Sequence, residues 1–307
     1  MFFADNRLLT RAVSHRRLMR AYLPDYELKT PASLDEALRL LSTEPGAWHP
    51  FAGGTDLMVL LEAGKLAHKQ FVSLWGLPEL SGIEVDDGQV TIGAMTTYSQ
   101  IQKDSILRSK FPMLCQAASL TGAVAIQNRG TLGGNIANAS PAADSLPALL
   151  VYEAELELIS SGSSRLIPYN GFHTGYKTTV MREDELIRAI RLPRTTATGK
   201  QHLRKVGTRK AQAISKVCIA AMAEVDGDTI KDIRLAYGSV APTPVRAWKT
   251  EAVLKGQKID PATIKAARAE VLHELKPIDD VRSTADYRSL VAANLLEEFL
   301  NKLIRKE

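Results

Sequence analysis

Two glycine pairs beside threonines constrain this chain more than any other feature of its sequence. The first lies in Pro50–Leu57 (PFAGGTDL) and the second in Gln127–Leu150 (QNRGTLGGNIANASPAADSLPALL). Glycine lets the backbone turn through positive φ and lets another group approach the main chain closely. Successive N–H groups in such a turn form a concave nest for anionic oxygens. One pair alone is typical of an ordinary tight loop, but two such loops suit one diphosphate better than two unrelated turns.

The first glycine pair lies between a predicted strand and a predicted helix. The strand is His49–Ala52, and the helix, Leu57–Ala63, is expected to be capped by Asp56 and ended by Gly64. An order of strand, glycine turn and helix start directs N–H groups at an anion. The segment lacks the GxGxxG spacing of a Rossmann fingerprint and the GxxxxGK pattern of a P-loop, so neither of those two folds is predicted.

The pattern up to residue 200 mixes strands and helices. Thr121–Ser140 is predicted to be one long glycine-rich loop, and a loop of that length inside a compact domain is usually functional. The polar stretch Pro193–Lys200 is predicted to link two domains. The other predicted elements are a helix from Leu34 to about Ser42 that begins with a capping box of Ser33 and Glu36, the helices Thr97–Lys103, Phe111–Leu120 and Leu146–Tyr152, the hairpin Gly82–Val85 with Gln89–Gly93, and the strands Gln70–Leu74, Ala154–Ser160, Arg165–Pro168 and Glu185–Leu192.

The C-terminal third predicts an antiparallel sheet followed by helices, which is an α+β module. The strands are His202–Gly207, Lys216–Val225 and Thr229–Val240, with a tight turn at Asp226–Asp228, and the helices are Ala247–Lys255, Pro261–Leu275 and Tyr287–Ile304.

Composition excludes several classes of partner and site. The 307 residues carry a net charge of +5, and much of the positive charge lies near the two ends of the chain. No basic stripe alternates with aromatic residues, so no nucleic acid is expected as a ligand. No apolar run has the length of a membrane span, and the six histidines have no metal-ligand spacing.

The N-terminus and the cysteines bear on where the protein works. Met1–Arg20 has arginines but no apolar run after them, so it is not a secretory signal. We expect it to be a disordered extension, and Met19 is an alternative first residue. Cys115 and Cys218 lie far apart in apolar contexts without a CxxC pattern. They are therefore expected to be buried thiols in a reducing compartment, which predicts a cytoplasmic protein.

A few polar side chains near the loops have two interpretations each. Thr55 and Thr131 adjoin the glycine pairs, where their hydroxyls can donate to phosphate oxygens. Asp144 either accepts hydrogen bonds from sugar hydroxyls or caps the helix that follows it. Lys205 and Arg209 either lie on a solvated strand face or place a cation over the cofactor.

Five segments together resemble the FAD-binding subunit of the molybdenum hydroxylases, the family of xanthine dehydrogenase and the medium subunit of aerobic carbon monoxide dehydrogenase. The resemblance runs from about Tyr22 to near the C-terminus, with both glycine motifs in order. The segments are AGGTDLMVLLEAGK (Ala52–Lys65), TIGAMTTYSQI (Thr91–Ile101), Ile126–Leu150, GYKTTVMREDELIRAIRLP (Gly175–Pro193) and KVGTRKAQAISKV (Lys205–Val217).

The resemblance implies an α+β fold: a two-subdomain FAD-binding domain of the vanillyl-alcohol-oxidase and MurB type, followed by a C-terminal α+β domain of antiparallel sheet and helices. On this basis we expect an extension over residues 1–20, an FAD-binding domain over 21–195 and a C-terminal domain over 200–307. The two subdomains are expected to cover about 21–75 and 76–195.

The resemblance also implies which residues bind FAD. In the family, main-chain amides and threonine hydroxyls of the two motifs bind the diphosphate and nearby ribityl oxygens. By position, the first motif is Phe51, Ala52, Gly53, Gly54, Thr55, Asp56 and Leu57, the second is Thr131, Leu132, Gly133, Gly134 and Asn135, and the further positions are Asp144, Ile187, Lys205 and Thr121. Thr121 departs from the family, since the animal enzymes have an aromatic residue there, so ring stacking is in doubt.

Some relatives of this fold bind FAD covalently through a histidine. Thr55 follows the glycine pair here, so non-covalent FAD is expected.

The function that the resemblance implies is that of one subunit of an oxidoreductase complex. A large subunit would oxidise the substrate at its molybdenum cofactor, and a small subunit with two [2Fe–2S] clusters would pass electrons to this FAD and on to an external acceptor. Two isolated cysteines cannot hold such a cluster, so the clusters are expected on the partner. A dimer of heterotrimers is one expected assembly. A self-contained FAD-dependent oxidoreductase of the same fold and a flavin-free assembly or binding protein remain alternatives.

Overall fold

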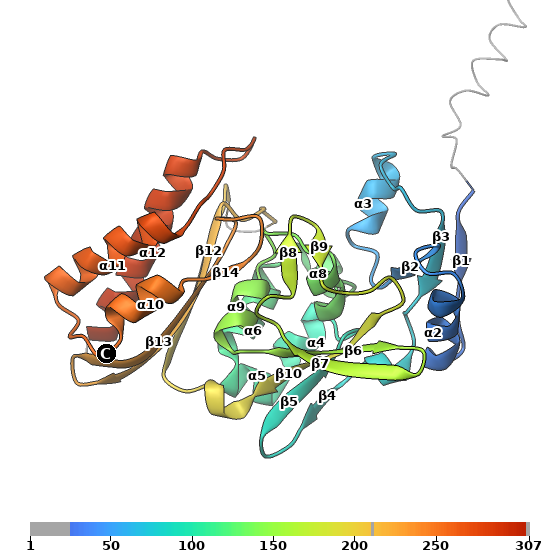
Figure 1. Ribbon diagram of the computed structural model, residues 1–307, viewed down its shortest axis with the longest axis horizontal. Helices are drawn as coiled ribbons and strands as arrows, with labels where there is room; N and C mark the ends of the chain where they lie inside the picture. The colour runs from blue at the N-terminus through green and yellow to red at the C-terminus, as the bar shows by residue number, and fades with distance from the viewer. Residues whose placement is uncertain (1–24, 210–211, 305–307) are drawn as a thin grey trace, which may run out of the picture.

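The computed structural model of the chain describes residues 25–209 and 212–304. The predicted extension Met1–Arg20 lies outside these residues. Figure 1 shows three groups of elements side by side, an N-terminal group, a central group and a C-terminal group. This arrangement confirms the predicted fold class, in which a two-part domain precedes a C-terminal module of antiparallel sheet and helices.

The N-terminal group is a parallel three-stranded sheet in the order β1-β3-β2. Its elements are β1 (Glu27–Lys29), α2 (Leu34–Thr43), β2 (Trp48–Phe51), α3 (Leu57–Glu62) and β3 (Gln70–Ser73). Helix α2 begins at the predicted cap, because the Ser33 hydroxyl accepts the N–H of Glu36. The second bond of the predicted capping box differs, since the Glu36 carboxylate accepts the N–H of Ala32 at 2.7 Å and not that of Ser33. The buried face of α2 packs in one core with Trp48 and Val72.

Helix α3 differs from the prediction. The side chain of Asp56 makes no capping hydrogen bond, so the predicted cap is wrong. The helix begins instead with the N–H of Met58 bonded to the carbonyl of Gly54 at 2.9 Å. None of its residues is buried, although all but the last are apolar. Its apolar side chains therefore remain available to border a cavity.

The central group is an antiparallel five-stranded sheet in the order β4-β5-β10-β6-β7. Its strands are β4 (Ile83–Val85), β5 (Gln89–Gly93), β6 (Glu155–Ser160), β7 (Ser163–Pro168) and β10 (Leu186–Pro193), preceded by the 3-10 turn Pro78–Leu80. The helices α4 (Tyr98–Lys103), α5 (Ser105–Lys110), α6 (Pro112–Leu120) and α9 (Leu146–Val151) share one apolar core with these strands. The β4–β5 hairpin is confirmed, whereas α5 was not predicted. A separate two-stranded hairpin, β8 (His173–Gly175) with β9 (Thr178–Thr179), lies beside this sheet.

The predicted single loop Thr121–Ser140 is wrong, because it contains two short helices. These are α7 (Val124–Gln127) and α8 (Leu132–Ala137). The Thr131 hydroxyl accepts the N–H of Gly134 at 3.1 Å and caps α8. Glycine has a low intrinsic helix propensity, so Gly133 and Gly134 concealed this helix in the sequence.

The C-terminal group is an antiparallel sheet in the order β11-β12-β13-β14, with three helices. Its elements are β11 (Lys200–Val206), β12 (Val217–Asp226), β13 (Thr229–Gly238), β14 (Val245–Arg246), α10 (Trp248–Leu254), α11 (Pro261–Glu274) and α12 (Ala285–Ile304). The three predicted strands and three predicted helices are confirmed, and β14 is additional. The 3-10 turn Arg194–Thr196 lies in the predicted linker.

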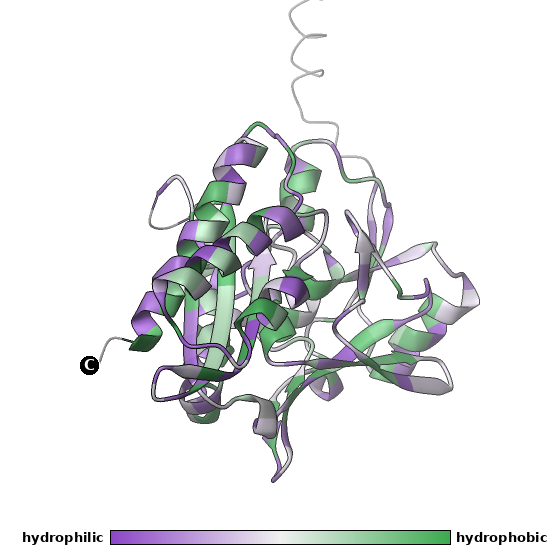
Figure 2. Ribbon diagram, turned by 60° about the vertical axis from the view of Figure 1, so that its left-hand side comes forward, coloured by the Kyte–Doolittle hydropathy of each residue, from purple (hydrophilic) through white to green (hydrophobic). Residues whose placement is uncertain are grey.

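The two faces of the C-terminal sheet contribute to different cores. Along β12, Ile219 and Ala221 pack with the helices α10, α11 and α12, whereas Ala220 and Met222 join the core of the central group. Successive strand residues point to opposite faces, so an uninterrupted apolar strand indicates a sheet that is covered on both sides. Figure 2 shows purple and green residues interspersed along the helices of this group, as expected for helices with one buried face.

Candidate cofactor-binding site

The two glycine loops touch each other, although the first follows strand β2 of the N-terminal group and the second lies between the helices α7 and α8 of the central group. A Cβ atom on Gly53 would lie 1.8 Å from the carbonyl oxygen of Arg129, which is backbone. A Cβ on Gly134 would lie 3.4 Å from the Cβ of Ala52. The first contact is possible only for glycine, because a Cβ would overlap the neighbouring chain. The two loops therefore form one continuous surface between the N-terminal and central groups.

The first loop carries backbone donors without a partner in the described part of the chain. The N–H groups of the five successive residues Gly53–Leu57 have no hydrogen-bond acceptor among the residues that the structure describes. Gly54 has a φ of +76°, so the chain reverses here in a conformation that other residues rarely adopt. A run of unpaired N–H groups in such a turn is suited to an anion.

The second loop differs, because the N–H groups of Leu132 and of both glycines already have acceptors within the protein. The N–H of Leu132 bonds to the carbonyl of Thr96 at 3.0 Å, and that of Gly133 bonds to the carbonyl of Ala94 at 2.8 Å. The N–H of Gly134 bonds to the Thr131 hydroxyl. The second loop is thus pinned to the central sheet, and the donors available to a ligand lie in the first loop.

A cavity of about 970 Å³ adjoins the first loop and passes between α3 and α7. Its volume falls in the range of cofactor sites. Gly53, Gly54 and Thr55 line it together with apolar and basic side chains, including Tyr26, Met58, Leu66, Lys69, Ile126 and Arg129. The Arg129 guanidinium stacks on the ring of Trp75 at 3.7 Å, which holds its charge at the junction of the two loops. The cavity therefore offers apolar walls, two cations and the free N–H groups.

A buried ion pair joins the central and C-terminal groups near the second loop. The Asp144 carboxylate accepts from the Lys205 ammonium at 2.6 Å and from the Ser215 hydroxyl. The side chains of Lys205 and Asp144 are 9% and 7% exposed, respectively. Burial raises the pKa of the Asp144 carboxyl, and Lys205 and Ser215 oppose that rise. Lys205 also donates to the carbonyl of Leu120 at 3.0 Å.

This ion pair overturns two interpretations that the sequence left open. Asp144 does not cap the following helix, since the N-cap position of α9 is Ser145 and no side chain makes a capping hydrogen bond there. Lys205 does not lie on a solvated face, because its side chain is almost fully buried. Arg209 is exposed and donates to the carbonyl of Gln212 at 2.6 Å. Lys205 and Arg209 therefore differ in surroundings despite their proximity in sequence.

Several other predicted site residues lie away from the cavity. Ile187 is 5% exposed within β10, opposite Leu158, in the core of the central group. Thr121 ends α6 and donates its hydroxyl to the carbonyl of Ala117 at 2.9 Å. Asn135 accepts from the Ser145 hydroxyl at 2.5 Å. The structure thus brings the first motif to the cavity and gives these three residues protein surroundings.

The sequence did not indicate two cations near the loops. Arg129 directly precedes the glycines of the second loop, so its position there was a usable signal. Lys177 lies in the β8–β9 hairpin, 3.8 Å from the carboxylate of Asp56. No local pattern identifies Lys177, because its contact depends on how the hairpin packs.

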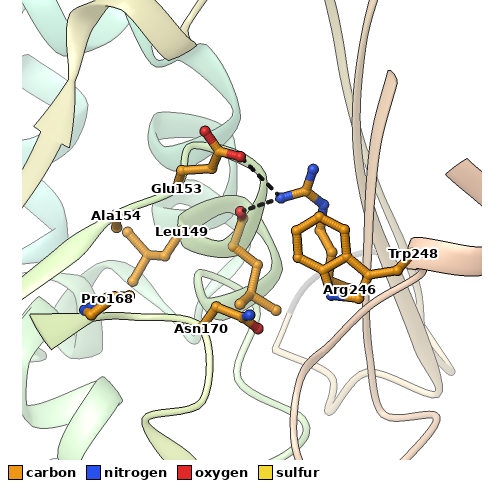
Figure 3. A pocket seen from close by; sticks show the side chains of 8 residues that line it. Leu149, Glu153, Ala154, Pro168, Asn170, Arg246 and Trp248 are labelled. Carbon is orange, nitrogen blue, oxygen red and sulfur yellow. Dashed lines mark hydrogen bonds and ion pairs between the residues drawn. The ribbon is translucent and has the colours of Figure 1, made fainter. Parts of the chain in front are cut away.

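A second hollow, of about 150 Å³, lies between α9 and the C-terminal group (Figure 3). Arg246 stacks on Trp248 at 4.1 Å and pairs with Glu153 at 3.5 Å. No predicted site residue lines this hollow.

Within the described ranges there is no group of three or more histidine, cysteine, aspartate or glutamate side chains that could hold a metal ion. Cys218 is buried as predicted, but Cys115 is only partly buried. None of the helices in the described part has the length and apolar character to cross a membrane.

Two family models together match nearly all of the described chain. Residues 24–195 match the FAD binding domain in molybdopterin dehydrogenase, and residues 202–303 match the C-terminal domain of the carbon monoxide dehydrogenase flavoprotein. The chain is 33% identical over 276 residues to the xanthine dehydrogenase FAD-binding subunit of Escherichia coli O157:H7, covering 89% of this chain and 94% of that one. It is 28% identical to the carbon monoxide dehydrogenase medium chain of Hydrogenophaga pseudoflava, covering 91% and 96%.

Solved structures give the same result. Carbon monoxide dehydrogenase from Hydrogenophaga pseudoflava matches with a TM-score of 0.85 at 29% identity, covering 91% of this chain and 96% of that chain. Quinoline 2-oxidoreductase from Pseudomonas putida 86 matches with a TM-score of 0.85 at 25% identity, covering 91% and 97%. The chain therefore belongs to the family of FAD-binding subunits of the molybdenum hydroxylases, which includes the xanthine dehydrogenase and carbon monoxide dehydrogenase flavoproteins.

Proposed function

We propose that this chain binds one non-covalent FAD and relays electrons from [2Fe–2S] clusters on a small partner subunit to an external acceptor. The substrate would be oxidised at a molybdenum cofactor on a large subunit. The observation that carries the proposal is the run of free N–H groups at Gly53–Leu57 beside a cavity of about 970 Å³, in a chain of this family. Relatives are named as the FAD-binding subunit or medium chain of their enzymes.

The residues around the cavity fit a dinucleotide with a diphosphate. The free N–H groups of Gly53–Leu57 and the Thr55 hydroxyl would hold the phosphates, and Arg129 would add a positive charge. The apolar side chains of α3 would contact the uncharged parts of the cofactor. When bound, FAD supplies the redox chemistry, and the protein supplies binding, orientation and electrostatics.

The buried ion pair would support the cofactor from the other side of the second loop. Asp144 and Lys205 would offer a carboxylate and an ammonium to polar atoms of the ribityl chain and flavin. Thr121, Ile187 and the motif Thr131–Asn135 remain proposed contacts by family position. No residue of this chain needs to act as a general acid or base in this function. The proposed domain boundaries stay at 21–195 and 200–307.

The proposed partners follow from what this chain lacks. Its two cysteines, Cys115 and Cys218, are both free and lie in different parts of the fold. An iron–sulfur cluster needs a set of cysteine ligands, so the clusters would belong to the small subunit. The two free thiols suit the cytoplasm. A dimer of heterotrimers remains the proposed assembly.

The proposal is tested by purifying the chain with and without its partner subunits. We expect a yellow protein that releases about one FAD per chain on denaturation, identified by chromatography. Alone, it should accept electrons from artificial donors and oxidise no purine, aldehyde or carbon monoxide. Co-expressed with the small and large subunits, it should co-purify in an active complex. Substrate oxidation by the isolated chain would favour the self-contained oxidoreductase, and a colourless protein that binds no FAD would favour the flavin-free alternative.

A further inference from the structure

The β8–β9 hairpin is fixed to the helix that carries the second glycine loop. His173 on β8 lies 2.9 Å, through its Nε2 atom, from the carbonyl of Ile136. The N–H of Lys177, between the two strands, bonds to the carbonyl of Ala139 at 3.3 Å. Figure 1 shows the hairpin beside α8. The position of Lys177 is thus set by the end of α8, not by the hairpin alone.

The backbone of Lys177 is in a conformation that lysine rarely adopts. Its φ is +58°, in the left-handed region. Such a conformation is unfavourable for a residue with a side chain, and it persists where the surroundings determine it. In this conformation the Lys177 side chain reaches both Asn138 and Asp56.

The Lys177 ammonium connects the ends of both glycine motifs. It donates to the side-chain oxygen of Asn138, which ends α8, and lies 3.8 Å from the carboxylate of Asp56, in the first loop. The side chains of Lys177 and Asp56 are 39% and 49% exposed. An ion pair this exposed contributes little to folding stability. Its main effect is therefore on the electrostatic environment of the first loop.

Asp56 is a carboxylate within the run of free N–H groups at Gly53–Leu57. The N–H groups suit an anion, but a negative side chain beside them repels one. We propose that Lys177 is a positioning residue for the diphosphate: it neutralises and holds Asp56, so that the first loop stays favourable to an anion. The inference rests on the proposed function and adds to it a residue outside both glycine motifs.

The test measures the affinity of full-length protein, freed of cofactor, for FAD, ADP and riboflavin by fluorescence or calorimetry. Lys177→Met should weaken FAD and ADP by roughly three- to tenfold, as expected for loss of one partly exposed charge, and leave riboflavin unchanged. Lys177→Arg should bind as the wild type does. The pair Lys255–Asp232, at 2.8 Å on the surface of the C-terminal group, provides the control variant Lys255→Met, which should bind normally.

The double variant tests the route through Asp56. If Lys177 acts by neutralising this carboxylate, Asp56→Asn should restore most of the FAD affinity lost in Lys177→Met. An unrestored double variant would overturn the neutralisation, and so would a Lys177→Met protein that binds FAD normally but melts at a lower temperature. If the wild type itself binds no FAD, the proposed function fails together with this inference; normal wild-type binding with an unchanged Lys177→Met overturns the inference alone.

Discussion

The buried pair of Asp144 and Lys205 gives a prediction whose size follows from the structure. Both side chains are less than a tenth exposed, at 7% and 9%. Removing one member of a buried ion pair costs about 3–5 kcal/mol, because the other charge is left buried without its partner. Replacing both by apolar residues of similar volume is often close to neutral. Asp144→Leu and Lys205→Met should therefore each destabilise the protein strongly, and the double variant should recover much of the loss.

The two single variants should differ in their response to pH. In Lys205→Met, the buried Asp144 carboxyl can lose its charge by taking up a proton, so the deficit should shrink as the pH falls from 7 to 5. Asp144→Leu has no carboxyl at this position to take up a proton, so its deficit should not shrink over that range. The assay is thermal and urea unfolding of cofactor-free protein at both values. A deficit of this size corresponds to a fall in melting temperature of the order of 5–10 °C for a chain of this length.

Additive effects in the double variant would refute the reasoning, because they would mean that the two side chains do not interact. The structure attributes the loss of stability in Asp144 variants to the ion pair and not to a helix cap, because no side chain caps the helix that follows Asp144. Any loss of FAD affinity in these variants would be an effect separate from this loss of stability.

Two further predictions concern the first sheet and its loop. Gly53→Ala should abolish FAD retention and lower the melting temperature, because the new Cβ would lie 1.8 Å from the carbonyl oxygen of Arg129. The matched control is Gly88→Ala, whose Cβ would lie 3.6 Å from its nearest neighbour. Equal behaviour of the two variants would contradict the close approach at Gly53. Burial and electrostatic repulsion by His68, whose ring stacks on that of His49, lower the pKa of His49 to about 4. The stabilisation from its neutral form is therefore complete above an unfolded pKa of about 6.5 and is lost as the pH falls towards 4. That loss of folding stability should reach roughly 2 kcal/mol after allowance for partial exposure. The free energy of unfolding, measured at pH 7 and 4.5, should therefore depend less on pH in His49→Gln than in the wild type. Identical pH dependence in the two proteins would contradict the lowered pKa of His49.

Structural elements could be predicted from the sequence where the contacts that stabilise them join residues close together in the chain. The start of α2 depends on Ser33 and Glu36, three residues apart: the Ser33 hydroxyl caps the helix as expected, and the Glu36 carboxylate reaches back to the N–H of Ala32, one residue before the cap. The turn between β12 and β13 depends on Asp226–Asp228, and the two strands pair across it. In both places the residues that determine the structure are neighbours in the chain.

The failures occur where distant contacts outweigh local preference. Helix α8 contains Gly133 and Gly134, which disfavour a helix, but bonds from its first N–H groups to Thr96 and Ala94 hold it in place. Asp144 and Lys205 were each assigned to the cofactor by resemblance, and neither assignment indicated that they bond to each other across 61 positions. A single sequence does not reveal such pairs, because no periodicity links them.

The two glycine motifs look alike in sequence, but their glycines serve different contacts. Gly133 packs against the backbone and side chain of Ala94, where a Cβ would approach to 2.5 Å, and its N–H is bonded. Gly53 packs against Arg129, and the N–H groups from Gly53 to Leu57 have no acceptor within residues 25–209 and 212–304. The second motif is thus bonded to the segment that follows β5, and the first motif packs against the second loop, with Gly53, Gly54 and Thr55 lining the cavity. An anion held there would contact a loop whose shape is fixed from behind, which limits the reorganisation that binding requires.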